Sequence, residues 1–223
     1  RLLEEGYISI RGKPTGRPFP ARLSRIGEPG RKVRVPTVTL GALVTYLQPF
    51  SHVMRAVLSA DPTLKAGLGA ANQLYEYVKR LRPVKQDYTS LTLLADLEEA
   101  TNWIRHDVGT LHWQSFLEGF GDVTDYIRFA PLLCLSPLAI EWKGQLVFTR
   151  CGAPMGLPGT KIILHTLGKA INIRADNRTG PQPFQRLKLS PFACAGDDIL
   201  KRGRKAVLDR HFPAAQDTYK VKP

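Results

Sequence analysis

Three aspartates in this sequence have the residue type and the setting of divalent-metal ligands. Asp197 and Asp198 follow Gly196 on a predicted turn, and Asp96 ends the apolar run Leu91–Ala95. Adjacent carboxylates repel each other, so a fold that presents two of them on a tight turn favours a bound cation. Because Mg²⁺ prefers carboxylate oxygens, the aspartates predict a site for Mg²⁺ or Mn²⁺. The alternative is that Gly-Asp-Asp is a plain hairpin turn, since both residue types favour turns.

Such a site suits phosphoryl transfer from a nucleoside triphosphate. This reaction needs positioning and charge neutralisation more than covalent help from the protein. Two divalent ions roughly 3.5–4 Å apart can hold the attacking and leaving oxygens. Asp96 and Asp197 would bridge such a pair of ions, and Asp198 would be a secondary ligand.

The segments that must position these residues are predicted from periodicity and turn signals. Leu91–Ala95 is apolar at consecutive positions, which is typical of a central strand covered on both faces. Lys143-Gly144 predicts a two-residue hairpin turn, and a glycine-rich turn over 151–160 leads into a helix. The predicted elements are a basic hairpin over 21–35, one or two helices over 40–59, a helix over 68–82, the strand 91–95, partly helical segments up to 130, a hairpin over 138–149, a helix over 161–172, an irregular connector over 173–191 and the Asp-Asp hairpin over 192–200.

The distribution of charge is informative, because the 223-residue chain carries a net charge of +13 at pH 7. Residues 11–34 hold eight Lys or Arg and one acid, 35–168 hold eleven of each, and 169–223 hold twelve basic and five acidic residues. A neutral core between two basic segments suits a polyanion held around a carboxylate site. The alternative is a basic surface that is only solvated.

Other bulk features restrict the class of protein. Hydrophobic and charged contents of 43% and 23% are ordinary for a globular protein. No run of about eighteen apolar residues occurs, so no transmembrane segment is predicted. The three cysteines and five histidines lack metal-ligand spacing, and the cysteines indicate a reduced, intracellular setting. The sequence begins without Met or a signal-peptide pattern, so we expect it to be a piece of a longer protein.

Four motifs, in this order, resemble those of viral RNA-dependent RNA polymerases. Glu28-Pro-Gly-Arg-Lys-Val-Arg34 resembles the basic fingers motif, Asp96-Leu-Glu-Glu-Ala-Thr-Asn102 the first palm motif, the glycine-rich segment 152–160 the second, and Ala195-Gly-Asp-Asp198 the third. The resemblance covers about residues 20–200 and is closest to narna-like and ourmia-like positive-strand RNA viruses. It implies an α+β right-hand polymerase palm, with an antiparallel sheet and helices on one face, plus partial fingers. We expect the thumb to be absent or truncated.

The resemblance also divides the chain by role. Residues 1–90 would form a fingers portion with the basic hairpin, and 91–110 the palm segment with the first aspartate motif. Residues 111–150 would form a fingers insertion with its hairpin. Residues 151–223 would return to the palm with the glycine loop, its helix and the Asp-Asp hairpin.

Site residues follow from the same resemblance. The catalytic metal ligands would be Asp96, Asp197 and Asp198. The residues that hold the incoming triphosphate would be Arg31, Lys32 and Arg34. The loop that contacts the template and the incoming ribose would be formed by Gly152, Gly156 and Thr160.

Two further roles are implied. Asn102 stands where the family has a second aspartate, and its amide would still hydrogen-bond the ribose 2′-hydroxyl. A lysine beyond the third motif usually protonates the pyrophosphate leaving group as a general acid. Lys220 and Lys222 are the candidates by position.

The resemblance implies RNA-templated RNA synthesis for viral genome replication. The partners would be an RNA template and product and nucleoside triphosphates, and the location would be the host cytoplasm or mitochondrion. One alternative is a non-catalytic basic RNA-binding protein, whose affinity would fall steeply with salt. Another is a reverse transcriptase, which Cys194 disfavours because that class usually has an aromatic residue there. No oligomeric state is predicted.

Overall fold

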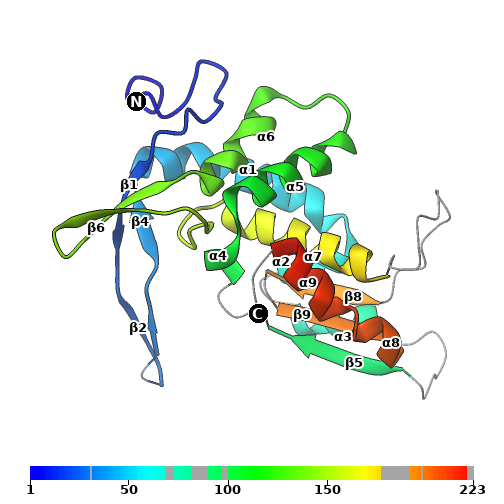
Figure 1. Cartoon of the computed structure of the whole chain (residues 1–223). Helices are drawn as coiled ribbons and strands as arrows, with labels where there is room; N and C mark the ends of the chain where they lie inside the picture. The colour runs from blue at the N-terminus through cyan, green and yellow to red at the C-terminus, as the bar shows by residue number, and fades with distance from the viewer. Residues whose placement is uncertain are drawn as a thin grey trace. The chain divides into compact units, whose positions relative to one another are not determined.

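A computed structural model describes residues 1–30, 32–68, 73–81, 90–96, 100–176, 191–196 and 198–219. The chain divides into two compact units, each made of two stretches of sequence. Unit 1 comprises Arg1–Val53 with Thr101–Ile163, and unit 2 comprises Met54–Ala100 with Leu164–Pro223. Both units combine helices and strands (Figure 1), as the predicted α+β class requires.

Unit 1 contains two sheets and the helices packed with them. Its elements are β1 (Phe19–Leu23), β2 (Ile26–Glu28), β3 (Lys32–Arg34), β4 (Thr37–Thr39), the first part of α1 (Gly41–Ser59), most of α4 (Ala100–Trp103), α5 (His106–Glu118), α6 (Asp125–Phe129), the 3₁₀ helix η1 (Ala130–Leu135), β6 (Leu138–Trp142), β7 (Gln145–Phe148) and the start of α7 (Thr160–Asp176). The larger sheet has the strand order β4-β1-β6-β7. Only β1 and β6 are parallel in it, and the other neighbours are antiparallel.

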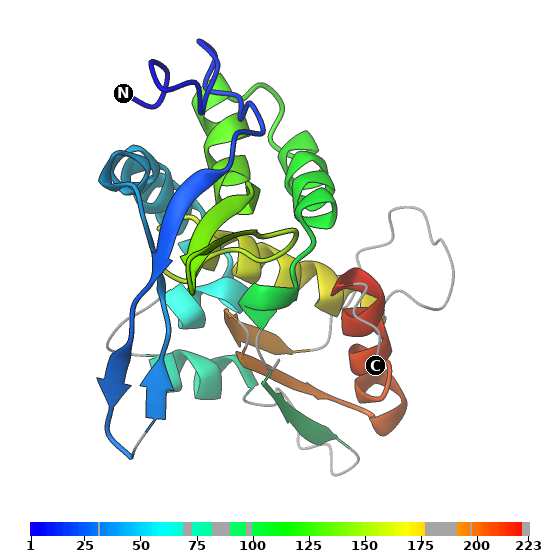
Figure 2. The ribbon, with the colours of Figure 1, turned by 60° about the vertical axis from the view of Figure 1, so that its left-hand side comes forward.

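The predicted basic hairpin is present as two consecutive strand pairs. β1 pairs with β4, and β2 pairs with β3 from Ile26↔Arg34 to Glu28↔Lys32. Figure 2 shows β1 and β2 in darker blue beside β3 and β4 in lighter blue. Gly30, in the turn, has a φ of 83°, which only glycine adopts without strain.

The second predicted hairpin of unit 1 is confirmed in detail. Trp142 pairs with Gln145 across the turn between β6 and β7. Lys143 and Gly144 have φ angles of 51° and 74°. Two positive φ angles in a two-residue turn match the right-handed twist of the flanking strands.

The core of unit 1 contains large aromatic rings among aliphatic side chains. Phe19, Phe50 and Trp113 are almost fully buried, and the rings of Phe50 and Trp113 meet edge to face with centroids 5.5 Å apart. Such edge-to-face contacts add to the free energy gained by burying the rings.

Helix α1 continues through Pro49, which lacks the N–H that a helix interior uses. The hydroxyl of Tyr126 lies between two groups of the helix backbone. It accepts from the Phe50 amide at 2.9 Å and donates to the Tyr46 carbonyl at 2.5 Å. The hydroxyl thus bridges the helical hydrogen bond that would otherwise join Phe50 to Tyr46.

Unit 2 is built on a three-stranded antiparallel sheet of order β5-β9-β8 (Figure 1). Its elements are the end of α1, α2 (Pro62–Leu68), α3 (Gln73–Leu81), β5 (Leu91–Ala95), most of α7, β8 (Phe192–Ala195), β9 (Asp198–Gly203), α8 (Lys205–Leu208) and α9 (His211–Tyr219). The predicted helix over 68–82 is present as α3. The predicted helix over 161–172 is α7, and it buries Leu164, Leu167 and Ile171 as its periodicity indicates.

The prediction that Leu91–Ala95 is a central strand covered on both faces is wrong. Among the described strands, β5 lies at the edge of its sheet and pairs only with β9. Leu91 is 50% exposed and Leu94 is 79% exposed. A run of consecutive apolar residues shows that both faces of a strand are apolar, but it does not supply the elements that cover them.

A buried ion pair joins β9 to the last residue of α7. Nζ of Lys201 lies 2.7 Å from Oδ1 of Asp176, and the side chains are 0% and 8% exposed. Burial lowers the pKa of Lys201, and the hydrogen bond and charge of Asp176 oppose that shift. Because an unpaired buried charge is costly, each of the two residues requires the other.

No helix among the described residues has both the length and the apolar composition needed to cross a membrane.

Candidate active site

Two aspartates lie together at one end of the sheet of unit 2. β5 and β9 pair antiparallel, and the last pair in their register is Ala95↔Ile199. One further step in this register brings Asp96 opposite Asp198. Residues opposite each other in an antiparallel pair share a face of the sheet, and both aspartates are exposed. The register therefore predicts that Asp96, the residue after β5, lies beside Asp198, the first residue of β9.

Asp198 is the first residue of β9, directly after the turn from β8. Ala195 pairs with Asp198, so the turn has two residues, and the first of them, Gly196, has a φ of 78°. This left-handed conformation favours glycine. The predicted hairpin over 192–200 is confirmed. Asp197 lies outside the described residues, so its approach to Asp96 stays a prediction.

The aspartates suit a hard divalent cation. Mg²⁺ binds through one or two protein carboxylates and keeps several waters as its other ligands. A pair of exposed carboxylates on adjacent strands therefore fits it. Within the part of the chain that the structure describes, no group of three or more His, Cys, Asp or Glu side chains could hold a metal ion. A metal site at this end of the sheet would draw on Asp96, Asp198 and the neighbouring Asp197.

Unit 1 carries the predicted triphosphate-binding positions on its basic hairpin. Lys32 and Arg34 are both on β3, and positions two apart on a strand share a face. Arg34 is exposed. Only the backbone of Lys32 is described, and Arg31 lies outside the described residues.

The glycine loop of unit 1 is joined to the segment that carries Asn102. The Gly152 amide donates to the Ile104 carbonyl and the Ala153 amide to the Thr101 carbonyl, both at 2.7 Å. Gly152 has a φ of 99°, and a Cβ on it would lie 3.3 Å from the Thr101 oxygen and 3.4 Å from that of Asn102. Two of the predicted ribose and template residues, Asn102 and Gly152, thus meet through the backbone. The side chain of Asn102 is exposed.

The other end of the loop packs inside unit 1. A Cβ on Gly156 would lie 2.6 Å from the carbonyl oxygen of Thr37 on β4, so this position accepts no side chain without a shift of backbone. Thr160 is 3% exposed, and its hydroxyl donates to the Pro154 carbonyl at 2.7 Å. The Thr160 hydroxyl therefore closes the loop in this conformation, and a contact with ribose stays a prediction.

His106, the first residue of α5, contacts this loop, and no motif in the sequence marks it. Its Nε2 lies 3.1 Å from the carbonyl oxygen of Gly152. Burial lowers the pKa of His106, against the opposing effect of that hydrogen bond. A carbonyl oxygen can only accept, so Nε2 of His106 is the donor in this contact. No sequence signal points to this contact, because the two residues are 46 positions apart.

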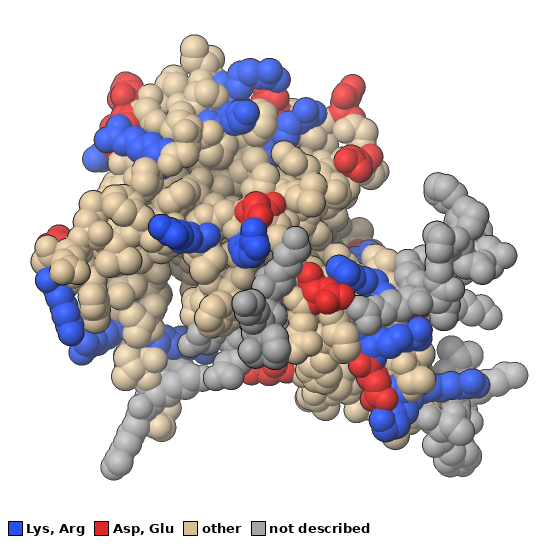
Figure 3. Space-filling view, in the orientation of Figure 1, with Lys and Arg blue, Asp and Glu red and all other residues tan. Residues whose placement is uncertain are grey.

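The basic C-terminal segment is visible at the surface of unit 2. Figure 3 shows Lys and Arg side chains around β9 and α8, where the chain carries Arg202, Arg204 and Lys205. Lys201, between them and Asp198, is buried instead. The predicted general acids, Lys220 and Lys222, lie outside the described residues.

Comparisons with known proteins bear on this arrangement. No protein-family model matches the chain, and no curated protein matches it. Two crystal structures of the RNA-dependent RNA polymerase of a human picobirnavirus match it, one of them an insertion-loop deletion mutant. The TM-scores are 0.66 for the mutant and 0.60, over 93% and 88% of this chain, with 13% sequence identity in both. The chain shares the fold of part of a viral RNA-dependent RNA polymerase.

The match covers 41% and 39% of the polymerase chains, so this chain spans about two fifths of their length. The comparison confirms that the chain has the fold of part of a viral RNA-dependent RNA polymerase, as the four motifs imply. The narna-like or ourmia-like affiliation stays a prediction.

Proposed function

We propose that this chain forms the palm and part of the fingers of a viral RNA-directed RNA polymerase. It would catalyse RNA-templated RNA synthesis by nucleotidyl transfer from nucleoside triphosphates. The observation that carries the proposal is the match of 93% of the chain to the fold of a viral RNA-dependent RNA polymerase. The exposed neighbours Asp96 and Asp198 support it, because the reaction needs carboxylates for metal ions.

The acidic end of the unit 2 sheet is the proposed catalytic centre. Asp96 and Asp198, with Asp197, would hold Mg²⁺ or Mn²⁺. Bound there, the ions supply charge neutralisation at the attacking and leaving oxygens of the transferred phosphoryl group. The protein contributes a fixed pair of strands, which keeps the two carboxylates at one separation before substrate arrives.

The residues of unit 1 are proposed to bind substrate. Arg34, together with Lys32 and Arg31, would neutralise the triphosphate through charge-assisted hydrogen bonds. The exposed amide of Asn102 would hydrogen-bond the ribose 2′-hydroxyl. Gly152 and Gly156 let the loop backbone pack against Thr101 and Thr37, and the loop held in this way would contact the template and the incoming ribose.

The finer assignments belong to the same proposal. The fingers would comprise residues 1–90 with an insertion at 111–150, and the palm would comprise 91–110 and 151–223, as the motifs imply. Lys220 or Lys222 would protonate the pyrophosphate leaving group. The enzyme would replicate the genome of a narna-like or ourmia-like virus in the host cytoplasm or mitochondrion.

Extension of a primed RNA template by the purified chain, with NTPs and Mg²⁺, tests the proposal. Asp197→Asn and Asp198→Asn remove ligands that stabilise the transition state by several kcal/mol, so each should lower the extension rate by roughly 100-fold or more. Both variants should unfold at the wild-type temperature. The matched control is Asp122→Asn, which changes an exposed carboxylate of unit 1 and should leave the rate unchanged.

Normal extension by the Asp197 and Asp198 variants would refute the catalytic assignment. RNA binding that falls steeply with salt, without synthesis by the wild type, would favour the non-catalytic RNA-binding protein. Incorporation of deoxynucleotides in preference to ribonucleotides would favour a reverse transcriptase.

A further inference from the structure

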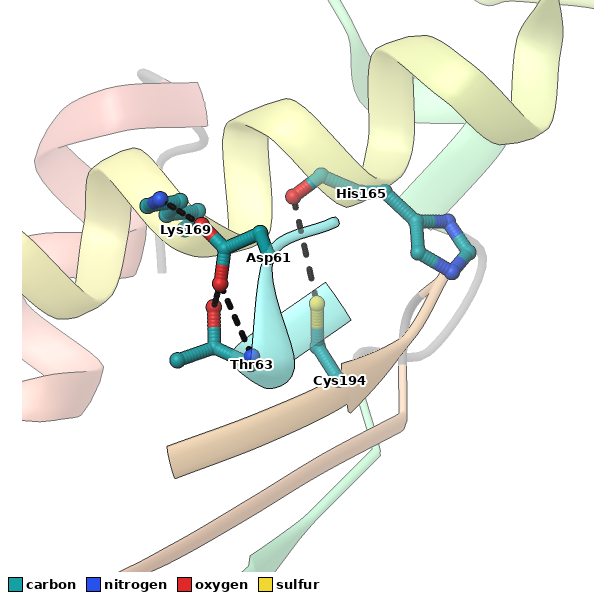
Figure 4. A network of polar contacts seen from close by, with 5 residues as sticks. All are labelled: Asp61, Thr63, His165, Lys169 and Cys194. Atoms are coloured by element: carbon teal, nitrogen blue, oxygen red, sulfur yellow. Dashed lines mark hydrogen bonds and ion pairs between the residues drawn. The ribbon is translucent and has the colours of Figure 1, made fainter. Parts of the chain in front are cut away.

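The start of α2 is tied to α7 by one aspartate that serves both helices. Oδ1 of Asp61 accepts hydrogen bonds from the Thr63 amide at 2.8 Å and from the Thr63 hydroxyl at 2.6 Å. Oδ2 of Asp61 forms an ion pair with Nζ of Lys169 on α7. Figure 4 shows Asp61 between Lys169 and Thr63. The Asp61 and Lys169 side chains are only 21% and 33% exposed, so solvent screens this pair less than a surface pair.

Further along α2, the helix backbone touches the strand that leads into the Asp-Asp turn. A Cβ on Gly67 would lie 2.2 Å from the carbonyl oxygen of Cys194 and 2.5 Å from Cα of Ala195. Real Cβ atoms do not approach so closely, so Gly67 holds α2 directly against the end of β8. A shift of α2 toward β8 would therefore push on Ala195, the residue that precedes Gly196.

Helix α7 contacts the same residues of β8 and the turn. A Cβ on Gly168 would lie 3.4 Å from Sγ of Cys194 and 3.7 Å from the carbonyl oxygen of Gly196. The Cys194 thiol also donates to the His165 carbonyl at 3.8 Å, as Figure 4 shows. The residues that lead into the turn thus contact α2 through Gly67 and α7 through Gly168.

We propose that Asp61 and Lys169 are positioning residues for the catalytic turn. Their ion pair fixes α2 relative to α7, and the two helices together fix the position of the turn that leads into Asp198. Neither residue touches substrate or metal in this assignment. The inference rests on the proposed function, because the turn is catalytic only if the chain is a polymerase.

The test compares Lys169→Met, Asp61→Asn and the double variant with the wild type in the full chain. Asn at 61 keeps an oxygen for the Thr63 amide and loses the charge, so α2 retains its cap. Matched controls are Asp209→Asn, which breaks an exposed ion pair of the same unit, and Asp122→Asn, which changes an exposed carboxylate of unit 1. Lys169→Arg keeps the positive charge and serves as the conservative variant.

A misplaced turn should slow the chemical step of the reaction. We expect about a 10-fold loss of kcat in each single variant with an unchanged KM for NTP, because small displacements of catalytic groups cost rate. The double variant should lose no more than the single variants, since one interaction is removed in all three. Lys169→Arg should recover most of kcat, and the control variants should stay within two-fold of the wild type.

Hydrogen exchange gives a readout that does not depend on activity. The amides of residues 194–199 should exchange at least several-fold faster in Lys169→Met and Asp61→Asn, and at the wild-type rate in the controls. Loss of thermal stability with unchanged kcat and unchanged exchange in the turn would overturn the inference. If the wild type performs no synthesis, the kcat comparison has no baseline, and the exchange rates alone decide whether the pair holds the turn.

Discussion

At the scale of single residues, contacts between distant parts of the sequence hold the candidate site. His106 and Gly152 are 46 positions apart, and Lys169 and Asp61 are 108 apart. Asp96 and Asp198 were predictable, because each follows a recognisable sequence pattern and carboxylates are needed for the chemistry. His106 and Asp61 have ordinary surroundings in the sequence, and only the folded chain supplies the partner that gives each a role.

His106 gives a residue-scale prediction. His106→Ala removes the donor to the Gly152 carbonyl and should lower the free energy of unfolding by about 1 kcal/mol. The amides of Gly152 and Ala153 should exchange faster with solvent, because the loop loses its hydrogen bond to His106. His106→Gln, which keeps an N–H donor, should cost less. Chemical denaturation and hydrogen exchange measure both effects, with His52→Ala on the exposed face of α1 as the control. Equal effects at positions 106 and 52 would contradict the assignment.

At the scale of elements, local signals predicted structure well where the chain reverses on itself. Lys143-Gly144 specifies its turn because that turn requires two positive φ angles, and Gly196 has the same role before the Asp-Asp pair. The position of β5 within its sheet was not predictable, since it depends on which strand pairs with each side. The continuity of α1 through Pro49 also escaped the sequence, because the group that bridges the helix comes from α6.

The bridging hydroxyl of Tyr126 gives an element-scale prediction. Tyr126→Phe leaves the Phe50 amide and the Tyr46 carbonyl without this partner in a part-buried position. Leaving such groups unsatisfied should lower the free energy of unfolding by about 1–3 kcal/mol. Chemical denaturation measures the change, and Tyr75→Phe, at a ring that is 64% exposed, provides the matched control. A loss no larger than that of the control would show that the hydroxyl does not support α1.

At the scale of the whole molecule, the order of motifs predicted a fold that sequence identity alone does not reveal. The solved polymerases are only 13% identical to this chain, yet aspartate, glycine loop and Asp-Asp hairpin occur in the family's order. The grouping into two units was not predictable in the same way. Each unit is assembled from two separated stretches, whereas the motifs were read as consecutive segments.

The buried side chain of His211 contributes to the pH dependence of the free energy of unfolding. His211 is 0% exposed, and burial, with the nearby charge of Lys201, lowers its pKa to about 4 against a weaker opposing effect of Asp176. The unfolded chain binds a proton near pH 6.5, so between pH 6.5 and 4 it holds more protons than the folded chain. Stability therefore falls as the pH is lowered through this window, by roughly 3 kcal/mol at its lower end.

Denaturant titrations at a series of pH values measure this loss. His211→Leu should flatten the dependence between pH 6.5 and 4, whereas His52→Ala should leave the wild-type slope intact. An unchanged slope in His211→Leu would show that other groups, such as carboxylates with native partners, account for the acid sensitivity.

The surroundings of the three cysteines have a practical consequence. Burial raises the pKa of Cys134 and of Cys194 to about 12, and thiols react as thiolates, so neither is a good target for maleimide reagents. Cys151 is partly exposed and immediately precedes Gly152. A single fluorophore or spin label can therefore be attached to the unmutated protein at the start of the glycine loop, where its signal would test the proposed contact of this loop with a nucleotide.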